Sequence, residues 1–99
     1  LADFFTERGV AFRYEAKLAI NGKVYYPDFM ILCDDGRILI WEHFGLMDKE
    51  EYFISACRKL EQYRRAGYVQ HSNLICTYEE DLRSGAVLEE ILLRYDLYS

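Results

Sequence analysis

Three carboxylate residues, Glu15, Asp28 and Glu42, form one acidic site if the segments that carry them pair as neighbouring strands. Between the first two lies Asn21-Gly22, a strong signal for a β-hairpin, because a type I′ turn needs positive φ at both central residues. A two-residue loop at this point sets Glu15 opposite Asp28. The sequence therefore predicts two acidic side chains side by side on one face of a sheet.

A second turn, at Asp34-Asp35-Gly36, decides whether Glu42 joins them. A three-residue connection, with Gly36 in the left-handed region, sets Asp28 opposite Glu42. The three carboxylates then form a row across adjacent strands, with steps of about 4.7–5.5 Å. A two-residue turn would instead place Glu42 on the opposite face and separate it from the others.

Like charges directly opposite each other destabilise a sheet, so such a row needs a counter-charge. Mg²⁺ is the natural one, because this hard cation takes one or two carboxylates together with waters and phosphate oxygens. The competing interpretation is that these residues are solvated strand positions. It suits Glu15 best, because Asp28 directly follows the only proline and Glu42 closes the apolar run of residues 37–42.

The predicted helix 49–66 carries a second signal. Tyr52, Ala56, Lys59 and Tyr63 share one helical face, so a lysine lies within an otherwise aromatic and small stripe. This lysine either extends past the tyrosines to solvent or is held toward an acidic partner. The second alternative would place a cation beside the carboxylates.

Charge limits how the chain could bind nucleic acid. It has 12 Lys and Arg against 17 Asp and Glu, a net charge of −5, which argues against binding by bulk charge alone. The helix 49–66 includes Arg58, Arg64 and Arg65 and is the most basic segment. Its basic side chains either contact phosphates or only keep the exposed face of the helix solvated.

The elements expected to position these residues follow the order α-β-β-β-α-β-α. This order predicts an α/β fold with a mixed four-stranded sheet between helices, because a helical crossover makes the last strand parallel to the third. The expected segments are helix 2–8, strands 11–20, 23–33 and 37–42, helix 49–66 with a capping box from Asp48 to Glu51, strand 73–77 and a helix from Ser84.

Ninety-nine residues with 52% hydrophobic side chains predict one globular domain, 1–99, and a start without methionine is typical of a fragment. The widely spaced Cys33, Cys57 and Cys76 are expected to be reduced core residues of a cytoplasmic protein, not a disulfide framework or a zinc site. No apolar run is long enough for a membrane span, and the start Leu1-Ala2-Asp3 does not have the basic character that a signal peptide is expected to show.

Taken together, the segments Tyr26-Pro27-Asp28-Phe29 and Trp41-Glu42-His43-Phe44-Gly45, the helix with Lys59 and Tyr63, and the strand Leu74-Ile75-Cys76 resemble the PD-(D/E)XK nuclease superfamily. The order and spacing cover nearly the whole chain. Within the superfamily, with its restriction-endonuclease-like fold, the chain is most similar to compact nuclease modules attached to helicase-like or other DNA-processing proteins. Such linked domains are therefore expected partners.

The resemblance implies phosphodiester hydrolysis in DNA with Mg²⁺ or Mn²⁺, and RNA stays open as a substrate. It makes Asp28, Glu42 and the backbone carbonyl of His43 the metal ligands. The strand lysine of the motif is replaced by Phe44, so Lys59 is the matching catalytic residue from the helix. Glu15 resembles the extra acidic residue that many members contribute from an N-terminal element.

Substrate contacts are expected from His43, Tyr63 and Arg58, although His43 could equally be hydrogen-bonded to backbone. Phe44 in the lysine position and the acidic balance also leave a second function open. This is a catalytically inactive nuclease-fold module for nucleic-acid binding or protein interaction. A purely structural role would follow if Asp28 and Glu42 lay on opposite sheet faces.

Overall fold

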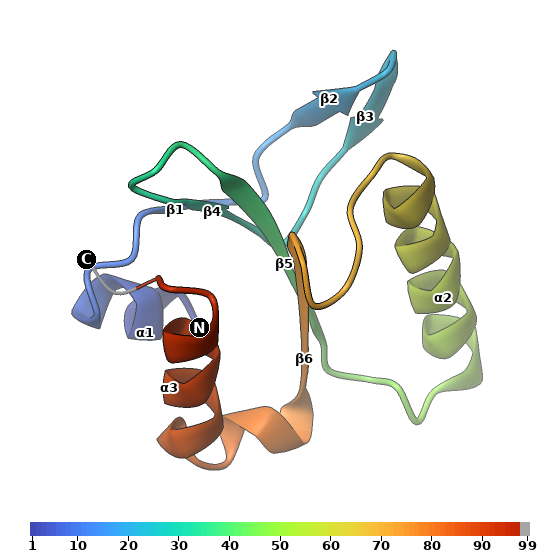
Figure 1. The fold of residues 1–99 in the computed structure, drawn as a ribbon. Helices are drawn as coiled ribbons and strands as arrows, with labels where there is room; N and C mark the ends of the chain where they lie inside the picture. Colours follow the sequence, from blue (N-terminus) through green and yellow to red (C-terminus); the bar gives the residue numbers. More distant parts are fainter. Residues whose placement is uncertain (98–99) are drawn as a thin grey trace.

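Four strands form a mixed sheet in the computed structural model, which describes residues 1–97 (Figure 1). Their order is β1-β4-β5-β6, in which β1 and β4 pair antiparallel with their neighbours and β6 is parallel to β5. Helix α2 (Glu50–Arg65) forms the crossover from β5 to β6. The predicted α/β class and mixed sheet are confirmed. The bounds are β1 Phe12–Tyr14, β4 Phe29–Leu32, β5 Ile38–Phe44 and β6 Leu74–Tyr78.

The two long strands predicted for residues 11–20 and 23–33 are wrong, because each is broken in the middle. Their outer halves, β2 (Leu18–Ile20) and β3 (Lys23–Tyr25), form a separate hairpin that projects from the main sheet (Figure 1). Two backbone features coincide with the break. Glu15 has φ of 49°, which L residues rarely adopt in a strand, and Pro27 has no N–H to donate.

The strand register is nevertheless the one that the turns predict. Ile20 pairs with Lys23, and the Glu15 amide donates to the Asp28 carbonyl at 3.0 Å. At the second turn Cys33 N donates to Arg37 O at 2.9 Å, and Gly36 has φ of 89°. The three-residue connection is therefore confirmed. Because Phe29 pairs with Trp41, the next positions along the two strands are Asp28 and Glu42.

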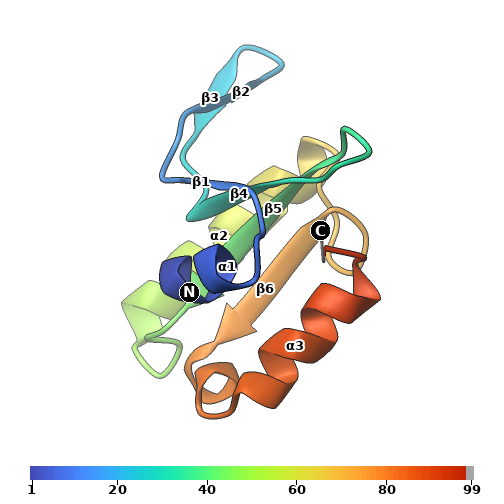
Figure 2. The same ribbon diagram turned by 90° about the vertical axis from the view of Figure 1, so that its left-hand side faces the viewer.

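Helices cover both faces of the sheet. Helices α1 (Ala2–Glu7) and α3 (Gly85–Arg94) lie on one face, and α2 lies on the other (Figure 2). The first face holds the larger core cluster, in which the Phe5 ring contacts Trp41 edge-on with centroids 4.8 Å apart. On the second face Ile40, Leu74 and Tyr63 form a smaller cluster. Glu42 points to this second face, toward α2.

The ends of α2 and α3 and the segment after β6 differ in part from the expected elements. The N-cap of α2 is Lys49 and no side chain caps it, so the predicted capping box from Asp48 to Glu51 is wrong. Ser84 does cap α3, accepting from Ala86 N at 3.2 Å. A short 3₁₀ helix, η1 (Glu79–Leu82), follows β6 and has no counterpart in the predicted elements.

The three cysteines are free, as expected, but they are not all core residues. Cys33 and Cys76 are half-buried, whereas Cys57 is exposed on α2, because its helical position faces away from the sheet. Across residues 1–97, no helix combines the length and apolar character that a membrane crossing requires.

Candidate functional site

Asp28 lies where the hairpin β2–β3 departs from the main sheet. Pro27 is buried directly before it, and β4 begins directly after it, so the aspartate is held at the start of a strand. Its Oδ2 accepts a hydrogen bond of 2.8 Å from the backbone N of His43 in β5. This bond fixes one carboxylate oxygen and leaves Oδ1 available to a ligand.

Glu42 is a buried carboxylate in the middle of β5, and its side chain is 1% exposed. Two groups from α2 contact it. The Nζ of Lys59 lies 2.8 Å from Oε1 and 2.9 Å from Oε2, and the Tyr63 hydroxyl donates to Oε1 at 2.6 Å. Lys59 and Tyr63 are four residues apart on one helical face, so both reach the same carboxylate. Of the two alternatives for Lys59, the one with an acidic partner holds.

The surroundings of Glu42 perturb its protonation. Burial raises its pKa to about 7, because desolvation disfavours the charged form, and the hydrogen bonds from Lys59 and Tyr63 oppose this rise. Asp28 lies close enough to raise the pKa further. Burial, together with Glu42, also raises the pKa of Tyr63, so its hydroxyl remains a donor. A carboxylate such as Glu42, with a perturbed pKa and a specific charge partner, is typical of functional sites.

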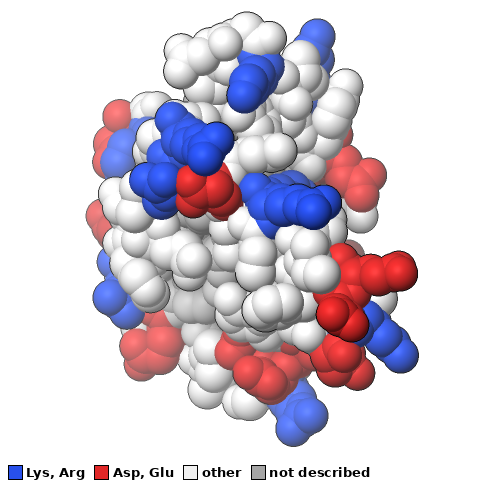
Figure 3. Space-filling model, turned by 90° about the vertical axis from the view of Figure 1, so that its right-hand side faces the viewer, with Lys and Arg blue, Asp and Glu red and all other residues white. Residues whose placement is uncertain are grey.

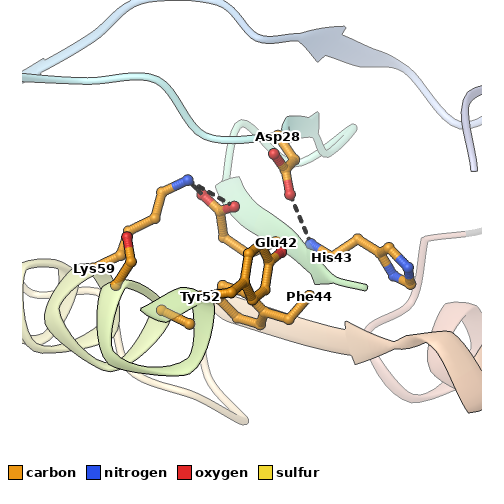
Figure 4. Close-up of a pocket in the computed structure, with 8 residues that line it drawn as sticks. Asp28, Glu42, His43, Phe44, Tyr52 and Lys59 are labelled. Carbon is orange, nitrogen blue, oxygen red and sulfur yellow. Dashed lines mark hydrogen bonds and ion pairs between the residues drawn. The ribbon is translucent and has the colours of Figure 1, made fainter. Parts of the chain in front are cut away.

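The carboxylates and the lysine line one cavity of about 240 Å³ (Figure 4). Asp28 enters it from the residue directly before β4, Glu42 enters it from β5, and Lys59 enters it from α2 on the other side. Figure 4 shows the Lys59 ammonium pointing at the Glu42 carboxylate, with the Asp28 side chain above both. The remaining wall consists of His43, Phe44, Tyr52, Ser55 and Ala56. The sequence-predicted pair and lysine are thus brought together.

Glu15 is opposite Asp28 in the register but does not line this cavity. Its positive φ takes it out of the alternation of a regular strand, and its exposed side chain lies beside Tyr14, whose pKa it raises. The predicted row of three carboxylates is therefore reduced to two. Across residues 1–97, no three His, Cys, Asp or Glu side chains gather closely enough to hold a metal by themselves.

Phe44 follows Glu42 on the same face of β5, where the resemblance expects a lysine. Its side chain is buried, and its ring packs against Tyr52 and Tyr78, with centroids 6.5 and 6.1 Å apart. A long cation at this position would have to displace this aromatic cluster. The position of the motif lysine is therefore filled by packing, and the cation of the cavity comes from α2.

His43 is held by side chains and not by backbone. Its Nδ1 lies 2.9 Å from Thr77 Oγ1, and its Nε2 lies 3.0 Å from Glu79 Oε1. Thr77 Oγ1 already accepts from Trp41 Nε1 at 3.0 Å, so its own proton can go to Nδ1. In that arrangement a neutral His43 ring carries its proton on Nε2, from which it donates to Glu79.

Two of the expected substrate contacts do not line the cavity. Tyr63 is fully buried, so the expected contact is corrected to a supporting hydrogen bond on Glu42. Arg58 is exposed and lines a neighbouring groove instead of the cavity. Thr77 and Glu79, which hold His43, were not predicted. The parallel pairing of His43 with Thr77 brings them there, and no local pattern in the sequence marks that register.

Comparisons of the chain with models of protein families, with curated proteins and with solved structures give no significant match.

Proposed function

We propose that this chain is a metal-dependent nuclease domain that hydrolyses phosphodiester bonds in DNA. One observation carries the proposal. One open cavity is lined by the buried carboxylate of Glu42, the half-buried carboxylate of Asp28 and the ammonium of Lys59. Two acids and a cation at one point are what positioning a divalent ion and a phosphate requires. The resemblance of the surrounding segments to the PD-(D/E)XK nucleases, with their restriction-endonuclease-like fold, supports the same activity.

The donor set suits a hard cation. Mg²⁺ and Mn²⁺ prefer oxygen ligands, and Mg²⁺ in proteins is held by one or two carboxylates with waters completing its shell. Asp28, through Oδ1, and Glu42 would supply these carboxylates, and the backbone carbonyl of His43 would be a third ligand. When bound, such an ion would activate water and neutralise charge on the phosphate.

The chain's own residues would orient the reactants. The Tyr63 hydroxyl and the Lys59 ammonium hold the Glu42 carboxylate in one orientation, and both do so from a rigid helix. Lys59 is one-third exposed, so its remaining N–H groups can reach an attacking water or a scissile phosphate in the cavity. A water oxygen would bond to phosphorus as the bond to the leaving oxygen breaks. The attacking water would lose a proton to solvent, and the leaving oxygen would take one from solvent to become a hydroxyl.

Cleavage assays test this function. Purified protein is incubated with single- and double-stranded DNA in Mg²⁺, in Mn²⁺ and in EDTA. We expect cleavage only with a divalent ion, and a loss of roughly 100-fold or more in Asp28→Ala and Glu42→Gln, the scale of an electrostatic catalytic group. Glu90→Gln, at an exposed carboxylate of α3, is the matched control and should retain activity. Metal-independent cleavage, or no cleavage of either DNA, would contradict the proposal.

A second candidate function is a nuclease-like module that binds nucleic acid without cutting it. It is favoured by Phe44 in the lysine position and by the Glu42 carboxylate, whose two oxygens already have partners within the chain. This function predicts nucleic-acid binding that is unaffected by EDTA and by Glu42→Gln. Metal-dependent cleavage that is lost in Glu42→Gln would eliminate it.

A further inference from the structure

A groove of about 460 Å³ lies next to the candidate active-site cavity, between the hairpin β2–β3 and helix α2. The hairpin contributes Val24, Tyr25 and Tyr26, and the helix contributes Arg58 and Gln62 among others. Ser55 and Lys59, one helical turn apart, line both the groove and the cavity. The two hollows are therefore adjoining parts of one surface.

The chemistry of the groove differs from that of the cavity. No Asp or Glu is among the described residues that line it, whereas the cavity contains two carboxylates. On this face of the molecule, Lys and Arg are prominent around the hairpin and the C-terminal half of α2, where Glu61 pairs with two of them, and most Asp and Glu lie toward the opposite end (Figure 3). The groove thus lies on the positive side of a chain that is acidic overall.

Two side chains of the groove, Arg58 and Tyr26, are not explained by contacts that stabilise the fold. Arg58 forms no ion pair or hydrogen bond within residues 1–97, whereas Arg64 and Arg65 both pair with Glu61. Tyr26 is 60% exposed, although burying an aromatic ring is favourable. An unpaired guanidinium and an exposed ring that line the same groove suit a ligand that has both an anion and a flat apolar surface.

We propose that this groove binds a single strand of nucleic acid, with a base stacked on Tyr26 and a phosphate paired with Arg58. Stacking on aromatic side chains beside a positive groove is how proteins hold single strands without reading their sequence. The strand would continue past Ser55 into the cavity, which would present the next phosphate to Lys59. The groove volume is in the range of small-ligand sites, which fits one or two nucleotides and not a duplex.

This inference rests on the proposed function for its biological meaning, but binding can be tested without cleavage. The experiment measures fluorescence anisotropy of short labelled oligothymidylate, oligouridylate and a DNA duplex, with the full chain in EDTA. The variants are Tyr26→Ala, Tyr26→Phe, Arg58→Ala and, as a matched control, Arg94→Ala at an exposed arginine of α3. Equal affinity for the two single strands would mean that the sugar is not read.

We expect single strands to bind more tightly than the duplex. Tyr26→Ala should weaken single-strand binding roughly 5- to 100-fold, the value of one stacked base, and Tyr26→Phe should keep most of it. Arg58→Ala should reduce the slope of log affinity against log salt by about 0.7, the value for one phosphate on a single strand. Arg94→Ala should change neither quantity.

Tighter duplex binding, no loss in Tyr26→Ala, or equal losses in Arg58→Ala and Arg94→Ala would overturn the inference. The two proposals can fail separately. Binding that depends on Tyr26 with no metal-dependent cleavage would remove the nuclease function alone. Cleavage that depends on Asp28 and Glu42 but not on Tyr26 or Arg58 would remove the strand-binding groove alone.

Discussion

The ammonium of Lys59 lies 2.8 and 2.9 Å from the two carboxylate oxygens of Glu42, and both residues line the cavity between β5 and α2. The carboxylate is buried, whereas the lysine side chain is one-third exposed. The pair therefore joins a sheet to its covering helix and also places a cation at the mouth of the cavity. Its removal should affect stability and function in separable ways.

Replacing Lys59 with methionine keeps the packing and removes the charge. Glu42 then loses its cation, so we expect the free energy of unfolding at pH 8 to fall by about 1–3 kcal/mol. This is less than the ~3–5 kcal/mol lost when a fully buried ion pair is broken, because Lys59 is partly exposed. The loss should be smaller at pH 5, where Glu42 is protonated. Urea unfolding measures it, with Lys17→Met at an exposed lysine as the control. A double variant with Glu42→Gln should recover part of the loss.

The pH dependence of stability should report Glu42 directly. Because the folded-state pKa is raised from 4.5 to about 7, the folded protein holds a proton that the unfolded chain releases between these values. The stabilisation from this group is complete below pH 4.5 and is lost as the pH rises to about 7, a change of about 3 kcal/mol. Glu42→Gln should flatten this part of the curve. An unchanged slope in that variant would show that another group is responsible.

Tyr63→Phe removes one hydroxyl and leaves the ring in place. The Glu42 carboxylate loses its 2.6 Å hydrogen bond, so we expect a loss of about 1.5–3 kcal/mol at pH 8, the range for hydrogen bonds to charged groups. Tyr68→Phe is the matched control, since this neighbouring ring is only half-buried. Single-strand binding in EDTA should not change, because Tyr63 is buried. A direct substrate contact by Tyr63 would instead weaken binding.

Thr77→Val tests the hydrogen bonds behind His43. The substitution leaves the buried indole N–H of Trp41 and the Nδ1 of His43 without their shared partner. We expect a loss of about 1–3 kcal/mol, the cost of unsatisfied buried polar groups, and a shift in the emission of Trp41, the only tryptophan. Thr6→Val on exposed α1 should show neither change. An unshifted emission would argue against the Trp41–Thr77 bond.

The parts of the site that could be predicted from sequence are those set by local chemistry. Asn21-Gly22 predicts a two-residue turn, which sets Glu15 opposite Asp28. The turn at Asp34-Asp35-Gly36 allows two lengths, and the three-residue one, which the structure has, brings Asp28 beside Glu42. The aromatic stripe around Lys59 likewise identifies a helical face that must meet the sheet.

The rest depends on tertiary structure. The left-handed backbone of Glu15 separates it from the other carboxylates, and no residue type at that position marks it. Thr77 and Glu79 reach His43 only because β6 pairs with β5 across a helical crossover. The sequence predicts Tyr63 as a substrate contact, and only the packed structure shows that its hydroxyl is buried on Glu42.

A calorimetric titration of the protein with Mn²⁺ and Mg²⁺, in the absence of nucleic acid, tests the metal site most directly. We expect divalent binding that Asp28→Ala and Glu42→Gln each remove and that Glu90→Gln retains. Circular dichroism of each variant confirms that it is folded. Folded wild-type protein that binds neither ion, or an Asp28→Ala variant that binds as the wild type does, would contradict a metal site at Asp28 and Glu42.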